Sequence, residues 1–284
     1  MTKRNSRILT PIIPFIAIPA TITGVYTMIY FNAPKQLWII NLTSVLIFSL
    51  LAFLFFKDRL RIKNINSKLI LFLAIILLFG TFFNKGIDDV HRWLNFGSIK
   101  LNVGLIISPV VLLLISRETN VYYCCAAFTL VTILFLLQPD ASLVTAFSIS
   151  ATILMIDKLK NKVIIIIFIL LVLLSVAFSW YFLDNLKPAN YVEDIMSLTE
   201  RISPYLFIIS LFSLFILVLP FFLGQFKKDK LIISLGCYFI LLITSSFIGN
   251  FPVMIIGYGF SPIIGYFIGL ILLIEKNKVP VIQL

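Results

Sequence analysis

The chain has 284 residues, of which 61% are hydrophobic and only 12% are charged, and its formal net charge is +11. A soluble domain of this length does not need so large an apolar fraction, so the composition excludes a soluble enzyme. It predicts helices in a bilayer, where every backbone N–H and C=O has to be hydrogen-bonded within the protein. The positive charge does not require nucleic acid as a partner, because cations gather at the cytoplasmic headgroups of a membrane.

Ten apolar stretches approach the length of a spanning helix, for which about 20 residues are needed and about 17 are the lower limit. They lie near residues 8–31, 36–56, 67–84, 102–116, 121–137, 141–156, 163–182, 204–225, 231–249 and 252–274. We therefore expect an all-α polytopic membrane protein with about ten transmembrane helices, forming a single integral membrane domain over residues 1–284. The Ser- and Thr-rich stretch 141–156 is included because the charge alternation requires a crossing there.

Basic residues between these stretches alternate from one side to the other. With the N-terminus inside, 17 of the 23 Lys and Arg residues fall in cytoplasmic segments and six in outer segments. Short loops rich in Lys and Arg stay in the cytoplasm, so both termini are predicted to be cytoplasmic. The six outer cations are Lys35, Lys85, Arg92, Lys100, Lys187 and Arg201.

The first polar region on the predicted outer side is an interfacial loop over residues 84–101. Aromatic and polar residues alternate in it, which is typical of a segment at headgroup level. Two interpretations remain open: a re-entry loop anchored by Trp93, or a lipid-headgroup site in which Arg92 and Lys100 contact a phosphate.

The second polar region is the turn Gln138-Pro139-Asp140 between two predicted helices. A carboxylate close to hydrocarbon is costly, so Asp140 needs a reason to be there. Either it caps the next helix through a backbone N–H, or it faces a polar cavity.

The third polar region is an outer loop over residues 183–203, which holds four of the chain's twelve acidic residues. From about Tyr191 to Ile202 the apolar spacing predicts an amphipathic helix. The loop is either a solvated surface helix or the carrier of a carboxylate that acts as a general base at the membrane surface.

The fourth polar region is rich in glycine and proline and covers residues 249–262. These residues predict a broken or kinked helix near the outer face, and freed backbone groups are tolerated there only inside protein or at a polar cavity. The alternative is close helix packing through small residues.

The order of these regions resembles the SEDS family (shape, elongation, division and sporulation), the RodA and FtsW type of ten-helix proteins. The most specific match is Leu137-Gln138-Pro139-Asp140, which matches the family's L-Q-P-D. The other matching stretches are Lys35–Trp38, Lys57–Arg61, His91–Gly97 and Gly257–Ser261. The resemblance implies a multi-pass protein of the bacterial plasma membrane.

SEDS proteins polymerise lipid II, an undecaprenyl-linked disaccharide, into peptidoglycan strands at the outer membrane face, in cell-shape or division pathways. By position, the resemblance makes Asp194 the catalytic base, with Glu193 as the alternative. It also implies a substrate-binding set of outer residues. These are Arg92, Trp93, Lys100, Gln138, Asp140, Lys187, Arg201 and Tyr258.

The resemblance further implies membrane lipid and a single-pass penicillin-binding protein transpeptidase as partners. It leaves open a divalent cation, Mg or Mn, and implies no other cofactor. The sequence itself has no Cys or His spacing typical of a metal site.

Two other functions are compatible with the sequence. The family's P-S-E is absent after the His91–Gly97 stretch, and the acid-bearing loop is short. Both departures would suit a catalytically inactive SEDS-like scaffold that binds a polyprenyl lipid or a cell-wall synthesis partner. A flippase for lipid-linked sugars is the third candidate, although the chain lacks the repeated halves with broken helices that many transporters have.

Overall fold

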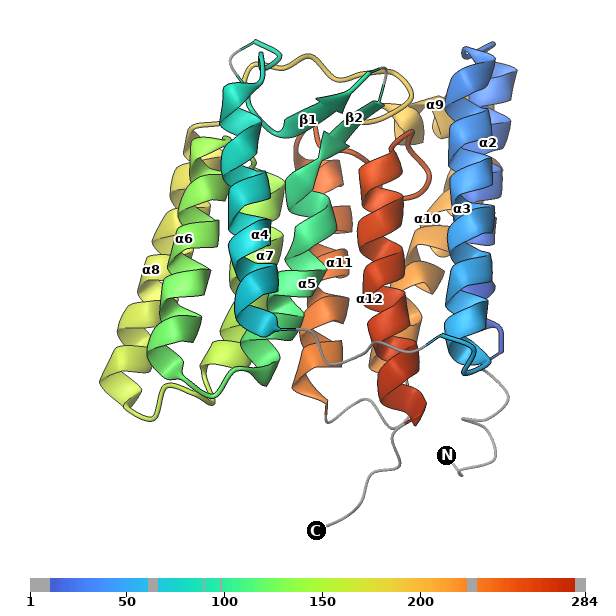
Figure 1. The fold of residues 1–284 in the computed structure, drawn as a ribbon. Coiled ribbons are helices and arrows are strands. Elements are labelled where there is room, and N and C mark those ends of the chain that lie inside the picture. The colour runs from blue at the N-terminus through green and yellow to red at the C-terminus, as the bar shows by residue number, and fades with distance from the viewer. Residues whose placement is uncertain (1–10, 61–65, 89, 98, 224–228, 279–284) are drawn as a thin grey trace. The chain divides into compact units, whose positions relative to one another are not determined.

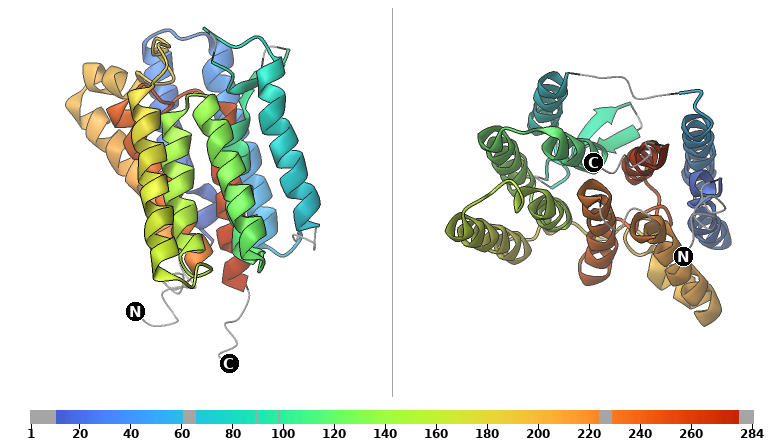
Figure 2. Two further views of the ribbon diagram at one scale, coloured as in Figure 1. Left: turned by 90° about the vertical axis from the view of Figure 1, so that its left-hand side faces the viewer. Right: turned by 90° about the horizontal axis from the view of Figure 1, so that it is seen from below.

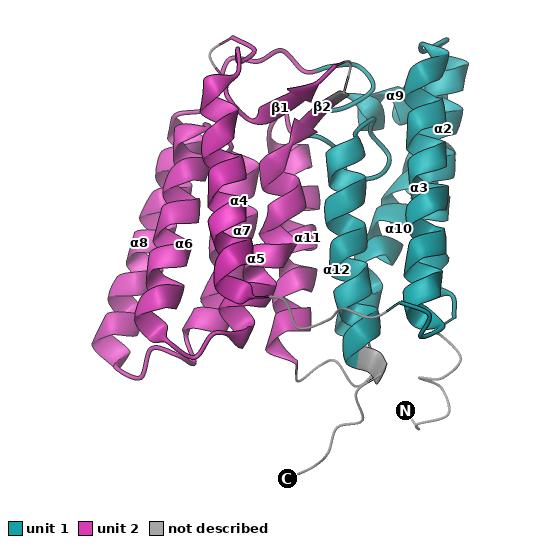
Figure 3. Cartoon of the chain, viewed as in Figure 1, with its two compact units in different colours: residues 1–65, 189–228, 252–284 teal, residues 66–188, 229–251 magenta. Residues whose placement is uncertain are grey.

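The computed structural model describes residues 11–60, 66–88, 90–97, 99–223 and 229–278, and these are mostly helical (Figure 1). For Ile99, Asn277 and Lys278 only the backbone is described. The chain divides into two compact units (Figure 3). Unit 1 comprises residues 1–65, 189–228 and 252–284, and unit 2 comprises residues 66–188 and 229–251.

Unit 2 contains six long helices and a small β-hairpin within its described residues. The helices are α4 (Ser67–Gly80), α5 (Val103–Arg117), α6 (Val121–Leu137), α7 (Ala141–Met155), α8 (Lys162–Tyr181) and α11 (Lys230–Ile248). A short 3-10 turn, η2 (Thr81–Phe83), extends α4. Asparagine or aspartate side chains accept backbone N–H bonds at the start of all six, so each helix begins at a residue suited to capping.

Helix α7 forms the core of unit 2 although it is rich in Ser and Thr. It packs against α5, α6, α8 and, most extensively, α11 (Figure 2). Four of its five hydroxyls are hydrogen-bonded, those of Ser142, Thr145, Ser148 and Thr152, whereas the buried Ser150 hydroxyl has no partner among the described residues. Thr145 donates to the carbonyl of Ala141 (2.7 Å) and accepts from the Trp180 indole (2.9 Å). Small polar residues allow helices in a membrane to approach closely, which explains a fully packed helix of this composition.

The predicted interfacial loop contains an antiparallel hairpin formed by β1 (Trp93–Phe96) and β2 (Ile99–Asn102) (Figure 1). The turn begins at Gly97, whose φ of 61° lies in the left-handed region that glycine adopts without a steric penalty. We call the end of unit 2 that carries this hairpin, the α6–α7 turn and the residues after α8 the hairpin end. The opposite end carries the α5–α6 and α7–α8 turns.

Unit 1 contains four long helices and one short helix within its described residues. The long helices are α2 (Ile18–Tyr30), α3 (Lys35–Phe56), α10 (Pro204–Val218) and α12 (Phe260–Lys278). The 3-10 turns η1 (Ile13–Phe15) and η3 (Leu219–Phe222) precede α2 and follow α10. The short helix α9 (Ile195–Ile202) packs against α2 and α10.

The amphipathic helix expected on the loop is present as α9. Ile195, Met196, Leu198 and Thr199 are buried along one face, while Glu200 is exposed. The helix starts at 195 and not near 191, because residues 189–194 form a turn. The loop thus packs its apolar face within unit 1.

Each of the ten predicted stretches contains a helix of the structure, which confirms the all-α membrane fold. Among the described residues, five helical segments are long and apolar enough to cross a membrane. They are Ile13–Tyr30, Lys35–Phe56, Lys162–Tyr181, Pro204–Phe222 and Lys230–Ile248. Four shorter apolar helices accompany them, so the count of ten crossings remains a prediction.

The predicted boundaries differ from the structure at several stretches. In the stretch 8–31 the α-helix begins at Ile18, after the turn η1. Two further differences are informative. The last long helix begins at Phe260 and not at 252, because the glycine- and proline-rich segment before it is not helical. Helix α10 ends at Val218, and a Pro-containing 3-10 turn over residues 219–222 replaces the predicted continuation of the α-helix there; residues 224 and 225 lie outside the described residues.

Both termini, and therefore their predicted cytoplasmic location, lie outside the described residues. So do several basic residues of the charge analysis, and Arg61 of the matching stretch Lys57–Arg61 is one of them. The undescribed basic residues are Lys3, Arg4, Arg7, Arg61, Lys63, Lys227 and Lys228.

Candidate functional site

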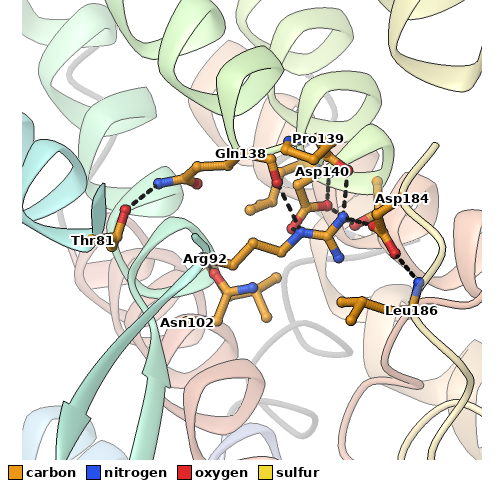
Figure 4. Close-up of polar contacts among 11 residues, drawn as sticks. Thr81, Arg92, Asn102, Gln138, Pro139, Asp140, Asp184 and Leu186 are labelled. Carbon is orange, nitrogen blue, oxygen red and sulfur yellow. Dashed lines mark hydrogen bonds and ion pairs between the residues drawn. The ribbon is translucent and has the colours of Figure 1, made fainter. Parts of the chain in front are cut away.

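Arg92 immediately precedes β1, and its side chain reaches the α6–α7 turn (Figure 4). The Arg92 carbonyl accepts from the N–H of Val103 at 3.4 Å, which continues the hairpin pairing of Trp93 with Asn102. The hairpin therefore fixes where this guanidinium begins, and only 4% of the residue is exposed.

The Arg92 guanidinium contacts two carbonyls and two carboxylates. Its Nε donates to the carbonyl of Gln138 at 3.1 Å and lies 3.5 Å from Oδ2 of Asp140. Its Nη2 donates to the carbonyl of Pro139 and to Oδ2 of Asp184. We call Arg92, Asp140 and Asp184 the ion cluster; all three belong to unit 2.

Asp140 combines two roles. Its Oδ1 accepts from the N–H of Leu143 at 3.0 Å and from the hydroxyl of Ser142 at 2.7 Å, so it caps α7 as the sequence allowed. Its other oxygen faces Arg92, and only 2% of the residue is exposed. One carboxylate thus both starts α7 and anchors the hairpin.

Gln138, also in this turn, faces α4. Its side-chain nitrogen donates to the hydroxyl of Thr81 at 2.8 Å, while its buried side-chain oxygen, Oε1, has no partner among the described residues. Gln138 therefore contributes its backbone carbonyl to the ion cluster and its side chain to packing against the end of α4.

Asp184 is the member of the ion cluster that the sequence analysis did not single out. It follows the long apolar helix α8, and its Oδ1 accepts from the N–H of Leu186 at 2.9 Å. The available signal was an acidic residue three positions after the end of a 20-residue apolar helix. That signal does not reveal a partner 92 residues away in sequence.

The ion cluster holds one positive and two negative charges, and the Arg92 guanidinium also lies 5.8 Å from the centre of the Phe251 ring. Removing one partner of a buried ion pair is strongly destabilising, because it leaves a desolvated charge. The cluster therefore ties the hairpin, the α6–α7 turn and the segment after α8 together. The Arg92 guanidinium already forms most of its contacts with groups of the protein itself.

The other predicted binding residues of unit 2 lie at its hairpin end, in the hairpin or in the segment after α8. Trp93 is half-buried in β1, and Lys100 in β2 and Lys187 beyond α8 are exposed. Neither lysine forms an ion pair with another residue in the described part of the chain. They are accessible cations, in contrast to Arg92.

In unit 1 the two candidate bases have different environments. Glu193 accepts the N–H of Ala189 through Oε2 at 2.8 Å, so its carboxylate closes the turn before α9. Asp194 stands at the N-cap of α9 without a side-chain capping bond and is half-buried. Within the described residues its carboxylate forms no hydrogen bond or ion pair.

The loop that carries Asp194 is fixed by the broken segment before α12. The N–H of Val253 donates to the carbonyl of Val192 at 3.2 Å, and the N–H of Tyr258 donates to the carbonyl of Tyr191 at 2.6 Å. The third and fourth polar regions of the sequence therefore meet in unit 1. Tyr258 is half-buried there, and Arg201, in the last turn of α9, is exposed.

This broken segment has an unusual backbone. Ile255 has a φ of 65° and is followed by a hydrogen bond from the N–H of Ile256 to the carbonyl of Met254 (2.7 Å). A β-branched residue in this conformation is strained and persists only where the surroundings impose it. The segment is thus held in one shape by its contacts.

No group of three or more His, Cys, Asp or Glu residues that could hold a metal ion occurs among the described residues. The ion cluster contains an arginine that already neutralises its carboxylates in part, and Glu193 is engaged by the backbone. These donor sets do not fit a divalent cation site.

No known protein-family model matches the sequence, and no curated protein matches it. Solved structures do match. Two crystal structures of the rod shape determining protein RodA of Thermus thermophilus, one of them a variant with an aspartate replaced by alanine, each give a TM-score of 0.66 at 14% identity. The match covers 94% of this chain and 97% of RodA. The chain therefore has the RodA-type fold of a multi-pass membrane protein.

Proposed function

We propose that this protein is a SEDS-type glycosyltransferase that polymerises lipid II into glycan strands at the outer face of a bacterial plasma membrane. The observation that carries the proposal is Asp194, on a loop of a RodA-type fold: its half-buried carboxylate has no hydrogen-bond partner among the described residues. A structural carboxylate at a helix N-terminus normally accepts a backbone N–H, and this one does not.

In the proposed reaction, Asp194 takes the proton from the acceptor sugar's hydroxyl. The hydroxyl oxygen forms the new glycosidic bond to the anomeric carbon of the donor, and the bond from that carbon to the diphosphate breaks. Undecaprenyl diphosphate leaves with the electron pair. A base has to be free to approach the hydroxyl, which favours Asp194 over Glu193, whose carboxylate binds the Ala189 N–H.

The departing diphosphate requires positive charge, because stabilising charge that develops in the transition state is the largest catalytic term in many enzymes. Lys100, Lys187 and Arg201 are exposed, and each remains a cation proposed from the sequence for phosphate binding. For Arg92 and Asp140 we propose an indirect role, holding the hairpin and the α6–α7 turn in place.

Trp93 and Tyr258 remain proposed contacts to the lipid-linked sugar. For Gln138, which is fully buried against the end of α4, we propose an indirect role in holding the α6–α7 turn. A requirement for Mg or Mn remains part of the proposal to be tested, and no step of the reaction is assigned to it. A single-pass penicillin-binding protein transpeptidase is the proposed partner, as the resemblance to the SEDS family implies.

The test is polymerisation of fluorescent lipid II by the purified protein, with Asp194→Asn and Glu193→Gln as a matched pair and with and without a chelator. We expect long chains from the wild type and from Glu193→Gln, and none from Asp194→Asn. Equal activity in both variants and the wild type would remove Asp194 as the base.

An inactive scaffold is the second candidate, and one observation favours it. Helix α5 is capped by Asn102, through its side chain and the Leu105 N–H at 3.3 Å, where the family has its P-S-E. If the wild type binds lipid II but forms no chains, with or without a transpeptidase partner, the scaffold interpretation replaces the polymerase. Transfer of a lipid-linked sugar from one leaflet of proteoliposomes to the other, without polymerisation, would instead support a flippase.

A further inference from the structure

Asn41 lies within the apolar helix α3 of unit 1 and is only 1% exposed. Its side-chain nitrogen donates to the carbonyl of Gly257 at 2.9 Å, and its side-chain oxygen accepts the N–H of Gly259 at 3.2 Å. Both ends of one buried amide are therefore used by the backbone of the segment before α12. A buried polar group in a membrane helix is expensive unless it is paired, so this arrangement calls for an explanation beyond packing.

The segment held by Asn41 is the one that holds the Asp194 loop. Between the two residues that Asn41 binds lies Tyr258, whose N–H donates to the carbonyl of Tyr191 at 2.6 Å. On the preceding side, Val253 donates to the carbonyl of Val192. Three residues along the chain from Tyr191 comes Asp194. A continuous set of hydrogen bonds therefore runs from Asn41 to the turn that carries the carboxylate.

Two glycines allow this close approach. A Cβ on Gly257 would lie 2.5 Å from the carbonyl oxygen of Val192, and a Cβ on Gly24 of α2 would lie 2.1 Å from that of Ile256. The segment is thus in backbone contact with the loop on one side and with α2 on another. The polar contact of this segment with α3 is made by the Asn41 side chain.

We propose that Asn41 is a positioning residue for Asp194: its amide fixes residues 257–259, and these fix the loop that presents the carboxylate. This inference rests on the proposed function for its catalytic consequence. A displacement of about 1 Å at a reacting group costs on the order of 100-fold in rate. Loss of the Asn41 amide therefore lowers kcat by about that factor and changes KM much less, because Lys100 and Lys187, the lysines proposed for phosphate binding, do not belong to the segment that Asn41 fixes.

The test compares Asn41→Leu, Asn41→Asp and a control, Ser49→Ala, in the lipid II assay and by backbone hydrogen exchange. Ser49 is buried on the same helix about 12 Å away, and its hydroxyl has no partner among the described residues. We expect Asn41→Leu to lose kcat and to exchange faster in residues 189–196 and 253–260, and Ser49→Ala to match the wild type in both.

Asn41→Asp supplies a rescue within one variant. A protonated carboxyl has a donor and an acceptor, as the amide does, whereas an ionised carboxylate only accepts and would face the Gly257 carbonyl oxygen. Its activity relative to the wild type therefore rises as the pH is lowered from about 8 to about 5, because burial favours the protonated form. Asn41→Leu shows no such rise.

The two readouts separate the inference from the proposed function. If the wild type makes no glycan, the proposed function fails and the catalytic consequence fails with it, while hydrogen exchange still decides whether Asn41 orders the loop. Unchanged exchange in both segments of Asn41→Leu, or wild-type kcat in that variant, would overturn the inference.

Discussion

The two ends of unit 2 both carry ion pairs, but in different surroundings. At the hairpin end, the side chains of Arg92 and Asp140 are 5% and 3% exposed, and that of Asp184 is 12% exposed. At the opposite end, Lys230 pairs with Asp157, and each of these side chains is 51% exposed. Ion pairs are thus buried at the hairpin end and solvent-exposed at the opposite end.

This difference in exposure indicates which end of unit 2 is held in one conformation. A solvated pair contributes between zero and about 1 kcal/mol, because water screens it and two flexible side chains must be ordered. A buried cluster adds little net stability when complete but is costly to break. The hairpin end is therefore fixed in one arrangement, as expected of the end where we propose substrate binding, whereas the opposite end tolerates change.

The largest effect is expected when Arg92 is replaced by Leu. Two carboxylates would remain buried without their guanidinium, so the free energy of unfolding should fall by about 3–5 kcal/mol. Thermal unfolding of the purified protein in detergent measures this. The triple variant Arg92→Leu, Asp140→Asn, Asp184→Asn should recover most of the loss; if it is no more stable than Arg92→Leu, charge is not the cause.

A smaller effect is expected for Asp184→Asn. In Asp184 one carboxylate oxygen accepts from Arg92 and the other from the N–H of Leu186, so the single amide oxygen of Asn keeps one of these two hydrogen bonds, and the Asp140 carboxylate remains to balance the guanidinium. We expect a loss of about 1 kcal/mol, the net value of a typical hydrogen bond. The same unfolding assay measures it, and a loss as large as that of Arg92→Leu would contradict the view of Arg92 as the centre of the cluster.

At the opposite end, Asp157→Asn should cost less than about 1 kcal/mol, since its pair with Lys230 is half-exposed. High salt should further reduce the difference from the wild type. A loss of several kcal/mol would show that the two ends do not differ in the way the exposures indicate.

The smallest effect concerns Glu118, in the α5–α6 turn of the same end. The backbone N–H groups of Asn120 and Thr119, together with the charges of Lys68 and Lys158, lower the pKa of this carboxyl below its ordinary 4.5. The ionised form is therefore favoured in the folded state. Its contribution is fully present above about pH 4.5 and is lost as the pH falls through the lowered pKa.

Glu118→Gln should accordingly differ from the wild type only slightly at neutral pH, and the difference should shrink on acidification. Unfolding midpoints of the two proteins from neutral pH to about pH 3 measure this. A difference that grows as the pH falls would give the opposite sign and contradict the lowered pKa.

The fold was accessible from the sequence, since membrane helices follow from apolar length and from the need to satisfy the backbone internally. The contacts that set the site were not. Arg92 and Asp140 stood out as polar residues in an apolar chain, but Asp184 and Asn41 became informative only when their distant partners were known.

Local patterns also misplaced structure at the outer loops. The alternation around Trp93 is equally typical of an interfacial loop and of a strand, so it did not predict that β1 and β2 pair. The start of α12 was placed eight residues too early, because hydropathy does not register the strained turn at Ile255.

The most direct test of the central claim is to measure undecaprenyl diphosphate released per molecule of lipid II consumed, by the purified wild type and by Asp194→Asn. We predict one diphosphate for each glycosidic bond in the wild type, and no release from an Asp194→Asn protein that unfolds at the wild-type temperature. Release at the wild-type rate from Asp194→Asn, or none from a folded wild type, would contradict it.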